Sequence, residues 1–296
     1  MNSTAIKFFN LADVAREQMA KMREGPPVLY STGIGDVDTL LRGGVAPGEV
    51  TIVGALTSHG KTMFMLQLAY EMAFQDLKCA FLSEEMTVTA LADRSIDYAC
   101  EWPADQRMSE WDKSFDDVIV FFEMRSSILC CRPCRDPDTA VEAISQAVTH
   151  HGVKVVFIDY LQKLRGKGED EVSRLTYASG VLATAAVEYG VAIVMGAQLN
   201  RSATTDNAYQ PKVSHLKGAS SIEQDASVIL LLVWPWQLDK SKPRNEYHVY
   251  CGKNRNRGIG GNGFAQLEFM PHRQKLISAA IPDAHVFNGY ERKDVF

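Results

Sequence analysis

Apolar runs alternate with stretches of helical periodicity along most of this chain. Uninterrupted β-branched runs predict buried strands, whereas apolar residues spaced three and four apart predict helices. Strands are expected at 50–53, 79–82, 118–122, 128–130, 153–158, 191–196, 228–233, 247–252 and 264–269. Helices are expected at 11–23, 61–76, 87–100, 138–150 and 170–189, with another starting near Ile222.

This alternation is typical of an α/β fold, in which helices cover both faces of a mostly parallel sheet. The last strands have little helix between them, which indicates antiparallel strands added at one edge. Asn10 is a suitable N-cap for the separate helix at 11–23, and Gly25-Pro26-Pro27 ends it. We expect an N-terminal arm over 1–27 and one α/β domain over 28–296.

Composition limits the class of protein. The chain has 296 residues, 46% of them hydrophobic, which is enough for one large core. No apolar run approaches the ~18–20 residues of a membrane span, and the N-terminus lacks the pattern of a signal peptide. We therefore expect a cytoplasmic protein with no membrane partner. The net charge of −5 means that any nucleic-acid binding must come from local basic segments.

Two of the six cysteines have a spacing that metal sites also use, in Cys131-Arg132-Pro133-Cys134. No second Cys or His pair lies at the distance of a zinc site. Ordinary reduced thiols are therefore favoured over a metal centre.

The strand at 50–53 leads into a small-residue loop that ends in Gly60-Lys61-Thr62 and continues as a helix. That is the context of a Walker A phosphate loop, whose amides and helix N-terminus face an anionic phosphate chain. The consensus has glycine where this chain has Ala55. Nucleotide contacts are expected from Ser58, His59, Gly60, Lys61 and Thr62, with the Thr62 hydroxyl also in the Mg²⁺ shell.

Polar residues follow three of the other strands. Asp159 ends an apolar strand, as does the carboxylate that holds Mg²⁺ in P-loop enzymes. Glu84 and Glu85 follow the strand at 79–82, where a carboxylate could activate water; spacing alone leaves open which of them does so. Gln198 could sense a γ-phosphate, or it could simply cap a loop.

Two segments are locally basic. The strand at 247–252 is followed by three cations, Lys253, Arg255 and Arg257. They could form a solvated turn, contact nucleic acid, or supply an arginine finger to a neighbouring subunit. The segment 202–221 has low hydrophobicity and carries Lys217 near its end. Long loops of this kind are usually functional or disordered, and a nucleic-acid contact is a reasonable expectation here.

Together, these segments resemble the C-terminal motor domain of DnaB-type replicative helicases, a RecA-like P-loop NTPase family that forms hexameric rings. The resemblance runs from about Ser31 to about Phe269. The family also has alanine at the position of Ala55. The motifs that carry the resemblance are Ser83-Glu84-Glu85-Met86, Ile158-Asp159-Tyr160-Leu161-Gln162, Gln198-Leu199-Asn200-Arg201, Ser221-Ile222-Glu223-Gln224-Asp225-Ala226 and Lys253-Asn254-Arg255-Asn256.

The resemblance implies roles for these residues. Glu85 would be the catalytic glutamate, while Glu84 stands where the family usually has leucine. The cofactors would be ATP, or another NTP, and Mg²⁺ held by Thr62 and Asp159. Catalytic roles are also implied for Lys61, Gln198, Lys253 and Arg255, and the last two would act on the neighbouring subunit's nucleotide. Contact with DNA is implied for Arg201, Lys217, Gly218 and Ser220.

Two departures from the family are visible. The family normally has an N-terminal helical domain that binds primase, and here only the helix at 11–23 stands before the motor, resembling the linker helix that docks on the adjacent protomer. In addition, Lys217-Gly218-Ala219-Ser220 replaces the family's Arg-Glu-Ser-Gly in the DNA-contacting loop.

We expect an ATP-dependent, ring-forming helicase or translocase that acts on single-stranded DNA in replication, with a primase or a loader as a further partner. One alternative is a RecA-fold ATPase that remodels protein–DNA filaments without unwinding. The other is a nucleotide-bound assembly or loading module that turns over slowly.

Overall fold

The computed structural model describes residues 10–100, 111–131, 133–204 and 209–278. The chain before residue 10 and after residue 278, which belongs to the expected arm and domain, lies outside the described residues. Within the described part, nine strands form one sheet in the order β3-β2-β4-β5-β1-β6-β7-β8-β9. Their bounds are β1 Val50–Ala55, β2 Cys79–Ser83, β3 Ile128–Cys131, β4 Val155–Asp159, β5 Ala192–Gln198, β6 Val228–Val233, β7 Glu246–Asn254, β8 Phe264–Met270 and β9 Lys275–Ser278.

The sheet is parallel from β3 to β6 and antiparallel from β6 to β9. The expected α/β architecture with antiparallel edge strands is confirmed. Because Ala55 pairs with Gln198 and Ser83 with Asp159, the carboxyl ends of four strands meet at one edge of the sheet. Side chains that follow these strands are therefore brought together there.

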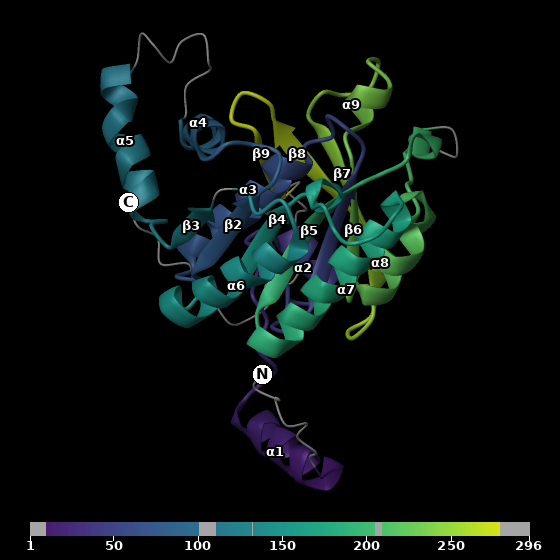
Figure 1. Ribbon diagram of the computed structural model, residues 1–296. Helices are drawn as coiled ribbons and strands as arrows, with labels where there is room; N and C mark the ends of the chain where they lie inside the picture. The colour runs from purple at the N-terminus through teal and green to yellow at the C-terminus, as the bar shows by residue number, and fades with distance from the viewer. Residues whose placement is uncertain (1–9, 101–110, 132, 205–208, 279–296) are drawn as a thin grey trace.

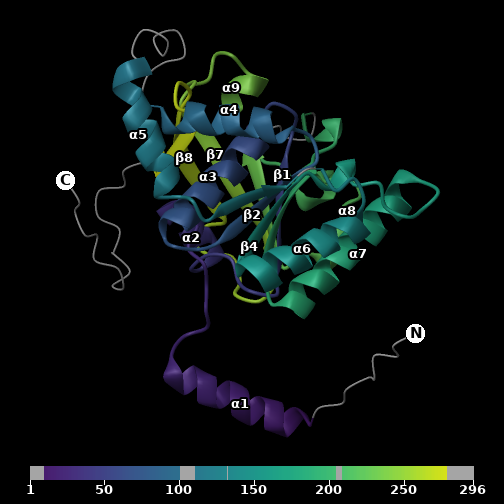
Figure 2. The same ribbon diagram turned by 60° about the vertical axis from the view of Figure 1, so that its left-hand side comes forward.

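Helices cover both faces of the sheet (Figure 1, Figure 2). One face carries α3 and α4, and the other carries α6, α7 and α8. The helices are α1 Leu11–Glu24, α2 Gly35–Leu41, α3 Lys61–Phe74, α4 Val88–Ala99, α5 Trp111–Glu123, α6 Pro137–His151, α7 Glu171–Tyr189, α8 Ala219–Asp225 and α9 Pro235–Leu238, with short 3-10 turns η1 Leu161–Lys163, η2 Arg201–Thr204 and η3 Val213–His215.

Each face has its own hydrophobic core because successive strand residues point to opposite sides. In β1, Val53 packs with the α3 side and Ile52 with the α7 side, and every residue of the strand is buried. This is why the parallel strands read as uninterrupted apolar runs in the sequence.

The expected strand at 118–122 is wrong, because these residues lie in helix α5. Val118, Phe121 and Phe122 are spaced three and four apart and pack toward Ala99 and Cys100 at the end of α4. The apolar run is long enough for a strand, but its burial follows a helical period.

Helix α8 begins at Ala219, three residues earlier than expected. Helix α2 and strand β9 were not expected. Helix α1 matches the predicted helix of the arm, with the side chain of Asn10 accepting a hydrogen bond from the N–H of Ala12 at 2.9 Å. It stands apart from the sheet and its helices in both views (Figure 1, Figure 2). No helix among the described residues is both long and apolar enough to span a membrane.

Candidate nucleotide site and its connections

The loop after β1 is shaped to receive an anion. Ser58 and Gly60 have φ of 65° and 78°, which turn the backbone sharply before α3 begins at Lys61. Gly60 has no side chain to strain in this conformation. Free N–H groups at the start of the helix then face the loop, where a phosphate chain would be stabilised.

Lys61 and Asp159 form an ion pair at the base of this loop. Lys61 Nζ lies 2.8 Å from Asp159 Oδ1, and the Thr62 hydroxyl donates to Asp159 Oδ2 at 2.6 Å. Asp159 is fully buried. Burial lowers the pKa of Lys61, and the charge of Asp159 opposes that shift. The two P-loop motifs expected from sequence are thus joined directly.

A cavity of about 730 Å³ opens over the loop. Several of the expected site residues line it: Ser58, Gly60, Lys61, Thr62, Glu85 and Gln198. Trp234, Tyr247 and Phe269 also line it and supply an apolar wall.

The two adjacent glutamates make different contacts. Glu85 lines the cavity over the phosphate loop. Its negative charge acts to raise the pKa of Lys61 and the pKa of Tyr160. Glu84 instead accepts hydrogen bonds from the backbone N–H groups of Cys134 and Arg135, at 2.9 and 2.8 Å. Of the two glutamates, Glu85 therefore lies in the cavity over the phosphate loop, whereas Glu84 makes a structural contact.

Gln198 connects the phosphate loop to the segment beyond β5. Its side chain donates to the Thr57 hydroxyl at 2.7 Å, and its backbone carbonyl accepts from the N–H of Lys217 at 3.0 Å. Gln162 reinforces this connection, because it accepts from the N–H of Gln198 at 3.2 Å and donates to the carbonyl of Lys217 at 3.4 Å.

The expected DNA-contacting residues lie in the segment that follows β5 and at the start of α8. Gly218 is the N-cap of α8 with φ 73°, and a Cβ there would lie 2.9 Å from Leu175. Lys217 is half-buried, with its Nζ 4.0 Å from Glu171 Oε1. Ser220 and Arg201 are exposed.

Lys253 and Arg255 are not among the residues that line the cavity over the phosphate loop of their own chain. Their side chains donate to the carbonyls of Glu223 and Gln224, at the C-terminal end of α8. Exposed carbonyls at a helix C-terminus attract cations. Burial and the neighbouring Arg255 lower the pKa of Lys253.

His59, from which a nucleotide contact is expected, has a buried side chain. It is 3% exposed and does not line the cavity. Its Nδ1 accepts from the N–H of Trp234 at 3.0 Å, while its carbonyl accepts from the Tyr247 hydroxyl at 2.6 Å. Burial lowers the pKa of His59 to about 4, so the ring is neutral at pH 7. The hydrogen bonds of His59 with Trp234 and Tyr247 fix the phosphate loop to the strands β6 and β7.

Two residues of the site were not expected from the sequence. A Cβ at Gly196 would lie 2.9 Å from Lys61 Cδ and 3.1 Å from Asp159 Oδ1, so this glycine leaves the room that the ion pair occupies. Lys61 Nζ also lies 3.6 Å from the centre of the Tyr160 ring. A glycine inside a buried strand was a usable signal, since such a residue often marks a close approach.

Cys131 and Cys134 have their sulfurs 3.7 Å apart. Among the described residues, no group of three or more His, Cys, Asp and Glu side chains gathers as a metal site would.

Comparison with known structures identifies the fold. A solved ATPase domain aligns with a TM-score of 0.80 at 20% identity, over 93% of this chain and 100% of that one. A DnaB-like replicative helicase, described with its interactions with primase, aligns with a TM-score of 0.79 at 21% identity, over 93% of this chain and 68% of that one. The expected RecA-like fold is confirmed by this similarity.

Sequence comparison points the same way. The replicative DNA helicase DnaB of Leifsonia xyli subsp. xyli is 31% identical over 255 residues, 81% of this chain and 54% of the relative. A probable plasmid replicative DNA helicase of Chlamydia psittaci is 25% identical over 221 residues, 72% of this chain and 48% of the relative. The chain thus spans about half the length of these curated relatives. The family model for the DnaB-like helicase C-terminal domain matches residues 30–277, and the chain belongs to that family.

Proposed function

We propose that this chain is an ATP-driven motor that translocates on single-stranded DNA and separates strands during replication. It would work as a ring, expected to be hexameric, with a nucleotide between adjacent copies. The observation that carries the proposal is the position of Lys253 and Arg255 relative to the chain's own nucleotide site.

These two cations lie near the amino ends of the parallel strands, whereas the phosphate loop lies at their carboxyl ends. Strand β7 runs antiparallel to β6, so Asn254 pairs with Val228, which in turn pairs with Thr51 near the start of β1. The phosphate loop begins only after Ala55. At about 3.3 Å per residue, the strand from Thr51 to Ala55 alone spans ~13 Å. A hydrolytic role for Arg255 therefore requires the nucleotide of another copy.

Within one subunit, Lys61 and the loop amides would bind the β- and γ-phosphates. Thr62 and Asp159 present oxygen atoms side by side, which is the donor type that Mg²⁺ prefers. A bound Mg²⁺ would neutralise charge on the phosphates. Glu85 would orient and deprotonate the attacking water, and Arg255 from the neighbouring copy would stabilise charge on the transferring phosphoryl group.

Gln198 would report the γ-phosphate to the DNA-contacting segment. It touches Thr57 on one side and the backbone of Lys217 on the other, so a shift of the loop would move the N-terminus of α8. The phosphate backbone of the strand would be held by Lys217, Gly218, Ser220 and Arg201. Helix α8 begins directly after Lys217 and Gly218 and ends near the carbonyls that hold Lys253 and Arg255, which would link DNA contact with the neighbouring active site.

The proposed ring draws support from helix α1. Its apolar Leu11, Met19 and Met22 are 82%, 59% and 69% exposed. Such a helix would bury these side chains by docking on an adjacent copy. A primase partner is proposed because a similar structure was described with its interactions with primase, and a loader is proposed from the family alone.

The test combines two assays on the full chain. ATP hydrolysis is measured with and without single-stranded DNA, and unwinding is measured on a forked duplex. We expect DNA-stimulated hydrolysis together with strand separation. Stimulated hydrolysis without strand separation would favour a filament-remodelling ATPase, and slow hydrolysis that DNA does not stimulate would favour a loading module.

A further inference from the structure

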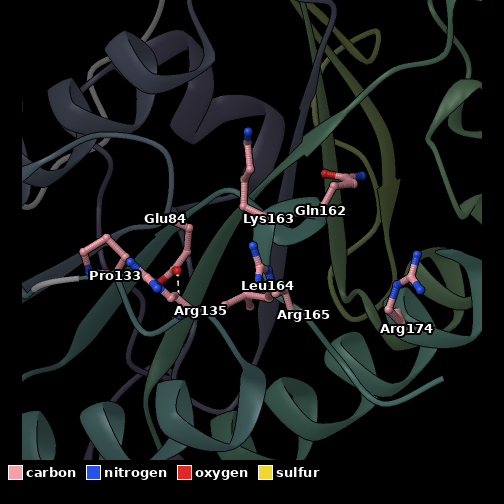
Figure 3. Close-up of a pocket in the computed structure, with 8 residues that line it drawn as sticks. All are labelled: Glu84, Pro133, Arg135, Gln162, Lys163, Leu164, Arg165 and Arg174. Carbon is pink, nitrogen blue, oxygen red and sulfur yellow. Dashed lines mark hydrogen bonds between the residues drawn. The ribbon is translucent and has the colours of Figure 1, made fainter. Parts of the chain in front are cut away.

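A second cavity, of about 740 Å³, lies at the carboxyl edge of the sheet. It is formed by the segments that follow β2, β3 and β4 and by the first turn of α7. Its lining residues are Glu84, Pro133, Arg135, Gln162, Lys163, Leu164, Arg165 and Arg174. Figure 3 shows Arg135 beside Glu84 on one side and Arg174 on the other, with the segment from Gln162 to Arg165 between them.

The charge around this cavity is unbalanced. Four cations line it, and Glu84 is the single acid among the described lining residues. Both oxygens of Glu84 already accept hydrogen bonds from the amides of Cys134 and Arg135. Among the described residues, none of the four cations forms an ion pair within 4.0 Å, although the charge of Asp170, at the start of α7, acts on Arg174. Like charges held around one cavity repel each other, and a bound anion would relieve that repulsion.

Backbone contacts join the two segments that carry Arg135 and Arg165. The N–H of Arg135 donates to Glu84, and its carbonyl accepts from the N–H of Arg165 at 2.6 Å. Arg135 also has φ 65°, a conformation that is uncommon for a residue with a side chain. The segments after β3 and β4 are thereby joined into one wall of the cavity, and Glu84, which precedes Glu85, anchors that wall.

The lining favours a phosphate chain over a whole nucleotide. None of the described lining residues is aromatic, so none offers a ring on which a base could stack. Separate guanidinium and ammonium groups around an open cavity suit the spaced phosphates of a strand instead.

The cavity also adjoins the proposed DNA-contacting segment. Gln162 lines it and donates to the backbone carbonyl of Lys217 at 3.4 Å. A strand held at Lys217 would therefore lead its next phosphates toward this cavity.

We propose that this cavity is a second contact site for the phosphodiester backbone of single-stranded nucleic acid, with Arg135 and Arg165 as its main cations. This inference rests on the proposed DNA-binding function. It adds residues that follow β3 and β4 to a contact otherwise assigned to the segment before α8. It also assigns a role to Glu84, because this carboxylate accepts a hydrogen bond from the backbone N–H of Arg135 and so positions that residue.

The test compares two double variants of the full chain with equal change of charge. Arg135→Gln/Arg165→Gln removes two cations from the cavity. Lys78→Gln/Lys154→Gln removes two exposed lysines that precede β2 and β4, at the opposite edge of the same sheet. Binding of a fluorescent oligo-dT is followed by anisotropy over a range of salt concentrations, and ATP binding is measured in parallel.

For the cavity variant we expect at least about a tenfold loss of affinity. Its salt dependence should also be shallower, by roughly 0.7 in slope for each phosphate that is no longer bound. ATP binding and the control variant should be unchanged. The variant Arg135→Lys/Arg165→Lys keeps the charge and should recover most of the affinity. If it binds as weakly as the glutamine variant, an electrostatic site is excluded.

The outcomes separate this inference from the function on which it rests. If Lys217→Gln weakens oligo-dT binding while the cavity variant binds like wild type, the second site is wrong and the proposed function stands. If the wild-type chain does not bind oligo-dT at all, both proposals fail.

Discussion

The backbone N–H of Lys217 lies 3.0 Å from the carbonyl oxygen of Gln198, whose own side chain reaches Thr57 in the phosphate loop. A single residue thus touches both the nucleotide loop and the segment proposed to hold DNA. Gln198 contacts Lys217 through its backbone carbonyl and Thr57 through its side chain. A substitution of the side chain therefore removes the contact with Thr57 and keeps the contact with Lys217.

Gln198→Ala cuts the link at the loop. We expect ATP to bind within about threefold of wild type, because Lys61 and the loop amides remain, while stimulation of hydrolysis by single-stranded DNA is lost. Steady-state hydrolysis with and without oligo-dT measures this. Stimulation that persists in Gln198→Ala would show that the DNA signal takes another route.

Glu85→Gln should lower the rate of ATP hydrolysis by about 10²–10⁴, the usual effect of removing a general base, with ATP binding retained. Glu84→Gln is the matched control, since it changes the adjacent residue in the same way. It should keep hydrolysis and instead loosen the segment at Arg135, at a cost of about 1–3 kcal/mol in stability. The opposite result for the two variants would reverse the assignment.

Gly196→Ala should disturb the ion pair between Lys61 and Asp159, because the new Cβ would lie 2.9 Å from Lys61 Cδ. We expect weaker nucleotide binding and a loss of about 1–3 kcal/mol in stability from overpacking. Gly180→Ala in α7 is the control, with nothing within 4 Å of the added atom. It should stabilise the helix by about 0.5–1 kcal/mol. Urea unfolding measures the change in stability, and titration with nucleotide measures the change in binding.

His59 should make the stability of the fold sensitive to acid. Its pKa is about 4 in the folded chain, against 6.5 ordinarily, so the unfolded chain binds the proton first as pH falls. The contribution of His59 to stability is therefore fully present above pH 6.5 and is lost between pH 6.5 and about 4, by up to ~3 kcal/mol. Urea midpoints at about pH 7.5 and about pH 5, on either side of the ordinary histidine pKa, measure the decline. His59→Gln should flatten it, whereas a change at the exposed His151 should not.

Arg255→Ala and Glu85→Gln should complement each other when mixed. Each variant alone should hydrolyse ATP slowly. In mixed assemblies, a subunit with intact Glu85 can receive Arg255 from a neighbour, and hydrolysis should return in part. No recovery in assemblies shown to contain both variants would place Arg255 outside the neighbouring site.

The sequence by itself determined the alternation of strands and helices and the loop that would bind phosphate. Buried parallel strands must be apolar on both faces, so runs such as 155–158 were visible without any structure. The phosphate loop was visible because its chemistry requires Gly60, Lys61 and Thr62 in consecutive positions. The prediction for 118–122 was wrong, since a short apolar stretch does not reveal by itself which period its burial follows.

Only the tertiary structure decided which residues meet across the sheet. The different contacts of Glu84 and Glu85 depend on where the segment after β3 lies, and no local spacing reports that. The space left by Gly196, the burial of His59 and the gathering of Arg135 with Arg165 have the same origin. Each depends on strand order and register, which bring distant segments to one edge of the sheet.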